Sequence, residues 1–251
     1  NEKYRNRRYT FVVEEINEEK SNLILKGKLS GNMHVFDEVY VYSLENDAFT
    51  ARILSIRMNE KTCRKAKDGN VEIIVKKNEK AKLIKKYCVL SDIIAVSDSM
   101  HDNQNELPYI RGLLSVYDVC HDDPHFTSLV LWLISHANLL VCAKSTTEHR
   151  GDIMDPLQEN TSAAFMSVST SADENLFILP AFTDWDALHR WSSMMMEKDA
   201  VTLIMKYEEV EKIMENGFGG IVINPFGPQP FFMPEQLCKT ILQMNQSEDD
   251  K

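Results

Sequence analysis

Residues 23–32 read LILKGKLSGN, and this stretch decides the fold of the first part of the chain. Apolar and polar residues alternate along it, as they do in a strand with one buried face. Gly27 and Gly31 interrupt the alternation at positions that suit a sharp bend or the close approach of another strand. The stretch therefore predicts a bent, half-buried β-strand.

Further strands are predicted downstream by the same period of two residues. They are expected at 37–42, 51–56, 71–75 and 84–90. The segment 66–70 is predicted to be the turn before the strand at 71–75, because its Asp-Gly pair tolerates positive φ.

Taken in order, the motifs GKLSG, DEVYV, ARILSI, AKDGNV and IKKYCVLS resemble domain II of translation GTPases such as elongation factor Tu. The resemblance implies a six- or seven-stranded barrel, which in that family contacts RNA or ribosomal surfaces beside a domain that hydrolyses GTP. This chain has Phe36 before Asp37, where the family commonly has Gly-Asp. It contains no GxxxxGK[ST] loop, so we expect neither GTP binding nor GTP hydrolysis.

The charge distribution divides the chain into two parts. Residues 1–91 hold 19 Lys and Arg against 13 Asp and Glu, whereas the remainder holds 9 against 25. Such a step in charge indicates separate domains. We therefore predict a barrel at 1–95, a linker at 96–106, an α/β domain at 107–244 and a disordered acidic tail at 245–251.

The composition points to a soluble cytoplasmic protein. No apolar stretch is long enough to span a bilayer, so we expect no membrane association. The five cysteines form no CxxC pair and are odd in number, which favours a reducing compartment over a disulfide framework.

Helices and strands alternate in the second part. Asp123-Pro124 predicts the start of a helix, Thr183 with Asp186 has the spacing of a capping box, and Gly217 is placed to end a helix. Two strands, at 165–169 and 176–181, are predicted to form a hairpin. The other elements are predicted as strands at 139–143, 201–205, 219–223 and 230–233, and a final helix from 234.

The motifs FILPAFT at 177–183, WDALHRW at 185–191, GIVINPFG at 220–227 and PEQL at 234–237 resemble the SseB family, the enhanced serine sensitivity proteins. The resemblance implies a compact bacterial α/β domain and a link to serine sensitivity. It implies no catalytic residues. Family members often have a second related domain downstream, whereas this chain has the predicted barrel upstream.

The best candidate site lies at the carboxyl ends of the predicted strands 176–181 and 219–223, where open α/β sheets bind ligands. We expect a groove for a protein partner there, formed by Phe182, Thr183, Asp184, Asn224, Pro225, Phe226 and Gly227. The alternative is a purely structural turn, in which Asn224 bonds its own backbone and Phe226 packs inward.

Other chemistry has weaker support. The segment 120–125, CHDDPH, offers metal-ligand side chains, but adjacent ligands rarely converge on one ion, and capping by Asp123 explains it better. We expect no cofactor and no metal. Nucleic acid is not expected either, since no aromatic residues are interleaved with the barrel lysines, which suit solvated strand edges.

These observations predict a multi-domain fold, an all-β barrel followed by an SseB-like α/β domain with a mixed sheet. We expect a non-catalytic protein that binds another protein or has a regulatory role. The alternative is an enzyme or a small-molecule-binding protein with its site around Asp184 and Asn224.

Overall fold

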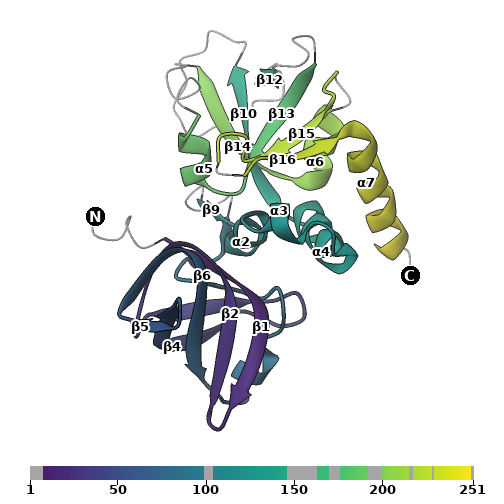
Figure 1. The fold of residues 1–251 in the computed structure, drawn as a ribbon. Coiled ribbons are helices and arrows are strands. Elements are labelled where there is room, and N and C mark those ends of the chain that lie inside the picture. Colours follow the sequence, from purple (N-terminus) through teal and green to yellow (C-terminus); the bar gives the residue numbers. More distant parts are fainter. Residues whose placement is uncertain are drawn as a thin grey trace. The chain divides into compact units, whose positions relative to one another are not determined.

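The computed structural model describes residues 8–98, 104–145, 163–169, 176–191, 199–214, 217–227 and 229–249. The chain forms two compact units (Figure 1). The first comprises Asn1–Val96 and Glu106–Val130, and the second comprises Ser97–Asn105 and Leu131–Lys251.

The first unit is built on a closed antiparallel barrel. The order β3-β7-β1-β2-β6-β4 is closed by pairing of β3 with β4, and β5 extends the sheet beside β4. The strands are β1 (Thr10–Glu19), β2 (Asn22–His34), β3 (Glu38–Tyr42), β4 (Phe49–Met58), β5 (Lys61–Cys63), β6 (Lys65–Lys76) and β7 (Val89–Ser91). The predicted barrel is confirmed, and its interior is filled by side chains that alternate along the strands, such as Leu23, Leu25 and Leu29.

The turn predicted at 66–70 is wrong, because β6 runs continuously through this segment. Asp68 and Gly69 do have positive φ, at 37° and 112°, but they lie in a continuous strand beside a β-bulge of β2, in which Ser30 and Gly31 oppose Asp68. The Asp68 carboxylate accepts a hydrogen bond of 2.7 Å from the Gly31 N–H, which ties the two irregular sites together. The local signal for positive φ was therefore correct, and its interpretation as a chain reversal was not.

Two further predictions in the barrel need correction. The strand expected at 84–90 is restricted to β7, since the short 3-10 helix η1 (Ala81–Leu83) and a turn precede it. Strand β1 was not predicted at all, although its Phe11, Val12 and Val13 are buried. A continuous apolar run of this kind is compatible with either a strand or a helix, so it gave no clear period.

Three helices follow: α2 (Pro108–Leu114), α3 (Tyr117–Cys120) and α4 (Pro124–Ser135). Helix α2 packs on β1 and β7, where Gly112 lies so close to Val89 that a Cβ atom would sit 2.7 Å from its Cγ1. Tyr87 donates a 2.6 Å hydrogen bond to the Asp123 carboxylate. Residues 106–130 therefore group with the barrel, whereas the sequence predicted a linker at 96–106 between the two domains. That predicted linker contains two short strands, β8 (Val96–Asp98) and β9 (Gln104–Glu106).

The second unit is an α/β structure around a mixed sheet of order β11-β10-β13-β15-β16, with β14 paired to β10. Its strands are β10 (Asn138–Ser145), β11 (Ala163–Phe165), β12 (Val168–Ser169), β13 (Phe177–Phe182), β14 (Ala200–Lys206), β15 (Gly220–Ile223) and β16 (Phe231–Pro234). Its own helices are α5 (Trp185–His189), α6 (Tyr207–Met214) and α7 (Glu235–Asp249). Of the described pairings among β10 to β16, that of β13 with β15 is parallel and the others are antiparallel.

Most element predictions in this unit are confirmed. The predicted pairing of 165–169 with 176–181 is confirmed in part: β12 pairs antiparallel with β13, whereas Phe165 belongs to β11 and pairs with β10. Gly217 follows α6 with φ of 104°. Every residue of β15 is buried, as the unbroken apolar run indicates. Helix α7 continues to Asp249 and so includes most of the tail for which disorder was predicted, since its first turns are anchored by the buried Cys238 and Ile241.

Candidate functional site

The parallel strands β13 and β15 bring two loops together at their carboxyl ends. Ala181 is in register with Ile223, and the Asn224 N–H donates to the Ala181 carbonyl at 2.8 Å. Thr183 and Asn224, which are 41 positions apart in sequence, therefore become neighbours. The sequence placed both residues at this end of the sheet, and the structure joins them by direct hydrogen bonds.

A buried hydrogen-bond network connects these two loops. The Asn224 Oδ1 accepts from the Thr183 N–H at 3.0 Å, while the Asn224 Nδ2 donates to Thr183 Oγ1 at 2.9 Å. Thr183 Oγ1 in turn donates to Asp184 Oδ2 at 2.8 Å. All three side chains are buried, so their polar atoms serve the fold and position the loops.

Asn105 belongs to the same network, although the sequence analysis did not single it out. It is fully buried, and its Nδ2 donates to the Thr183 carbonyl at 3.2 Å and to the Asn138 carbonyl at 3.1 Å. An isolated Asn in a polar segment has no distinctive sequence signature. Only the fold shows that it holds β9, β10 and the loop after β13 together.

The cap of helix α5 is Asp184, and the prediction of Thr183 as the cap is wrong. Asp184 has extended backbone angles, and its Oδ1 accepts from the Ala187 N–H at 2.9 Å. The Thr183 hydroxyl is bonded instead to Asp184 and Asn224. Asp184 thus has both carboxylate oxygens engaged, one by the helix and one by Thr183.

The loop after β15 has a fixed shape. Asn224 has φ of 51°, a left-handed conformation that Asn tolerates better than most residues. The Gly227 N–H donates to the Asn224 carbonyl at 2.9 Å and closes a tight turn around Pro225 and Phe226. The predicted turn chemistry is therefore present, and it holds Phe226 at the tip.

The Phe226 side chain lies at the outer end of a column of three aromatic rings. Its ring stacks on Trp191 with centroids 5.5 Å apart, and Trp191 stacks on Phe182 at 6.0 Å. Phe182 is fully buried, Trp191 is nearly buried, and Phe226 is 39% exposed. Of the seven predicted groove residues, only Pro225, Phe226 and Gly227 reach the surface appreciably. Trp191 supports Phe226 but was not among the predicted groove residues.

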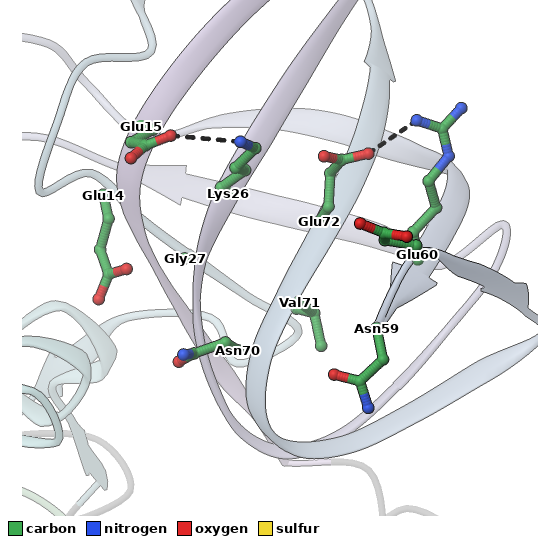
Figure 2. A pocket seen from close by; sticks show the side chains of 10 residues that line it. Glu14, Glu15, Lys26, Gly27, Asn59, Glu60, Asn70, Val71 and Glu72 are labelled. Atoms are coloured by element: carbon green, nitrogen blue, oxygen red, sulfur yellow. Dashed lines mark hydrogen bonds and ion pairs between the residues drawn. The ribbon is translucent and has the colours of Figure 1, made fainter.

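A separate hollow of about 510 Å³ lies on the outside of the barrel (Figure 2). Across its rim Glu15 pairs with Lys26 at 3.4 Å and Arg57 pairs with Glu72 at 2.8 Å. These four residues are consecutive cross-strand neighbours on β1, β2, β6 and β4, so charges of alternating sign follow one another across the sheet. Such pairs stabilise the strand register, and both cations of the hollow are already neutralised.

The segment 120–125 has a structural role. His125 donates its N–H to Asp123 Oδ1 at 3.0 Å, which confirms the predicted cap of α4. The Tyr87 hydroxyl is the main cause that lowers the pKa of Asp123 to about 2. Within the parts of the chain that the structure describes, no three His, Cys, Asp or Glu side chains are arranged to hold a metal ion.

The buried thiols are not activated as nucleophiles. Burial raises the pKa of Cys142 to about 11 and also raises the pKa of Cys88 and Cys238. A catalytic cysteine needs a lowered pKa.

None of the helices in the described ranges is long and apolar enough to cross a membrane.

Comparison with known families identifies a domain of this chain. Residues 111–238 match the model of the SseB protein N-terminal domain, which is about half of the chain and includes the strand ends, the Thr183–Asn224 network and the aromatic column. No curated protein matches the chain.

Proposed function

Because this chain belongs to the SseB family, and because its strand-end loops present a single supported aromatic side chain, we propose that it is a non-catalytic protein that binds a protein partner at Phe226. We call the surface formed by Pro225, Phe226 and Gly227 the Phe226 tip. The observation that carries the proposal is the column Phe182–Trp191–Phe226, in which two buried rings hold an exposed one.

The support for binding comes from how the Phe226 tip is held. Its loop is anchored by the Asn224–Thr183 hydrogen bonds and by the Gly227–Asn224 turn. Little conformational freedom is then lost when a partner covers the ring, and preorganised aromatic side chains are frequent hot spots of protein interfaces.

The alternative of an enzyme centred on Asp184 and Asn224 has less support. Both side chains are buried, and their described hydrogen bonds are made to Thr183 and to the start of α5. A catalytic carboxylate needs access to substrate. The link to serine sensitivity and the cytoplasmic location remain predictions, and growth of a deletion strain on serine together with cell fractionation would test them.

The test compares Phe226→Ala with Phe177→Ala. Phe177 is a matched control, since it lies at the opposite end of β13 and is 51% exposed. We expect Phe226→Ala to lower stability by only about 1 kcal/mol, the contribution of one aromatic pair. A partner recovered by affinity purification with the wild type and with Phe177→Ala should be lost with Phe226→Ala, since a hot spot contributes about 2 kcal/mol or more.

Two results would overturn the proposal. If Phe226→Ala unfolds the second unit to the extent expected of a buried phenylalanine, about 3–5 kcal/mol, the ring is structural. If the variant retains its stability and recovers the same partners as the wild type, the Phe226 tip is not the docking surface.

A further inference from the structure

An exposed aromatic side chain on the barrel belongs to a residue with an unfavourable backbone conformation. Phe36 has φ of 72°, in the left-handed region that bulky residues avoid, and its side chain is 63% exposed. A glycine would adopt this conformation without steric cost. The ring therefore gives the barrel little burial in return for the strain of its backbone.

The turn that contains Phe36 is fixed by its neighbours. The Phe36 N–H donates to the Ile53 carbonyl at 2.8 Å, and the Ile53 N–H donates to the Asp37 carbonyl at 3.0 Å. Asp37 Oδ2 accepts from the His34 N–H at 2.9 Å and from the Tyr9 hydroxyl at 3.3 Å. These bonds would hold any residue at position 36 in the same place, so they do not explain why a phenylalanine is there.

One basic side chain contacts the Phe36 ring, and three more basic residues lie close to Phe36 in the barrel. The Arg52 guanidinium lies over the ring, 5.5 Å from its centroid. The Arg64 carbonyl accepts from the Val35 N–H at 3.0 Å, one residue from Phe36. Lys65 and Lys67, both exposed, lie opposite His34 and Asn32 in the β2–β6 register.

These four cations are available to a ligand. Among the residues that the structure describes, none of the four lies within ion-pair distance of a carboxylate. Glu38 is the cross-strand neighbour of Arg52, and Asp37 is bonded inward to His34 and Tyr9. Lys77, Lys82 and Lys85 of the same barrel differ, since each is paired with a glutamate.

We propose that Phe36, Arg52, Arg64, Lys65 and Lys67, here called the Phe36 patch, form a second docking surface, for an acidic segment of a partner protein that carries an apolar side chain. The apolar side chain contacts the Phe36 ring, and its flanking carboxylates pair with the four cations. Single-stranded nucleic acid fits less well, because its binding surfaces carry a series of aromatic rings for successive bases, and this patch has one. The strain at Phe36 is then explained, since strained residues that the fold itself does not need cluster at functional sites.

The experiment measures fluorescence anisotropy of short labelled probes on the full chain. The first probe is a peptide with glutamates around a Leu-Phe pair, the second has glutamine in place of every glutamate, and the third is a single-stranded oligonucleotide of mixed sequence. The variants are Phe36→Gly and the triple variant Arg52→Gln, Arg64→Gln, Lys65→Gln. The triple variant Lys77→Gln, Lys82→Gln, Lys85→Gln removes equal charge from ion-paired positions of the same barrel and serves as the control.

We expect saturable binding of the acidic peptide to the wild type and to the control, weakened at least about tenfold by Phe36→Gly and by the Arg52 triple variant. The binding should weaken as salt is added, and the glutamine peptide should not bind. Phe36→Gly should melt no lower than the wild type, which separates lost binding from lost folding.

Three results would overturn the inference: no binding of the acidic peptide, an equal loss in the control triple variant, or tighter binding of the oligonucleotide that is also lost with Phe36→Gly. A fall in melting temperature with Phe36→Gly would show that the ring stabilises the barrel, and the functional reading of its strain would then fail.

Discussion

Replacement of Asn224 by alanine tests whether the buried network at the strand ends holds the second unit together. The change removes the acceptor of the Thr183 N–H and the donor to Thr183 Oγ1. Leaving the buried Thr183 N–H without a partner costs about 1–3 kcal/mol. Alanine at φ of 51° adds about 1 kcal/mol, because its Cβ disfavours the left-handed region that Asn tolerates.

The expected loss is therefore about 3 kcal/mol, which corresponds to a fall in melting temperature of about 6–12 °C for a protein of this size. Asn224→Gly removes the same hydrogen bonds without the backbone penalty. It should consequently be milder than Asn224→Ala by about 1 kcal/mol.

Tryptophan fluorescence is the appropriate assay. The chain has three tryptophans, Trp132, Trp185 and Trp191, and all belong to the second unit, so the thermal transition of that unit can be followed by itself. Asn59 is the control, since it has φ of 48° but is exposed on the barrel. Asn59→Ala should leave the tryptophan transition unchanged.

An unchanged transition in Asn224→Ala would refute the reasoning about the network. Equal transitions for Asn224→Ala and Asn224→Gly would refute the reasoning about the backbone, while the role of the hydrogen bonds would stand.

Two further predictions concern the first unit. Gly112→Ala should destabilise the first unit by about 1–3 kcal/mol, because the new Cβ would lie 2.7 Å from Val89 Cγ1. Thermal unfolding followed by circular dichroism measures the loss of stability. An unaltered melting temperature would show that α2 does not pack tightly on the barrel. Burial raises the pKa of Asp92 from 3.8 to about 6, so the folded state binds a proton more tightly than the unfolded chain, and stability falls as pH rises from 3.8 through about 6. Asp92→Asn keeps an acceptor for the Tyr9 N–H, so its melting temperature should exceed that of the wild type at neutral pH and equal it near pH 3.8. A difference in melting temperature that does not change with pH would contradict this assignment.

The sequence could predict features that depend on a few adjacent residues. Positive φ at Gly217 and the helix start at Pro124 follow from the chemistry of single residues and their immediate neighbours. The buried strand β15 follows from the unbroken apolar run Gly220–Ile223, and the alternation in β2 follows from the two faces of a strand. The strand-end cluster was also predictable, because the carboxyl ends of neighbouring strands meet at one edge of a sheet.

Tertiary structure decided the features in which distant residues compete for the same partner. Asp68-Gly69 suits a turn or an irregular strand site equally well, and only pairing with the bulge at Gly31 on β2 selects the strand. Thr183 and Asp184 are both good caps, and the hydrogen bonds of Thr183 with Asn224, 41 positions away, leave the cap to Asp184. Asn105 bonds the Thr183 carbonyl, and Trp191 stacks on Phe226, only because the fold brings these residues to the strand ends. Such contacts depend on proximity in space and produce no periodic pattern in the sequence.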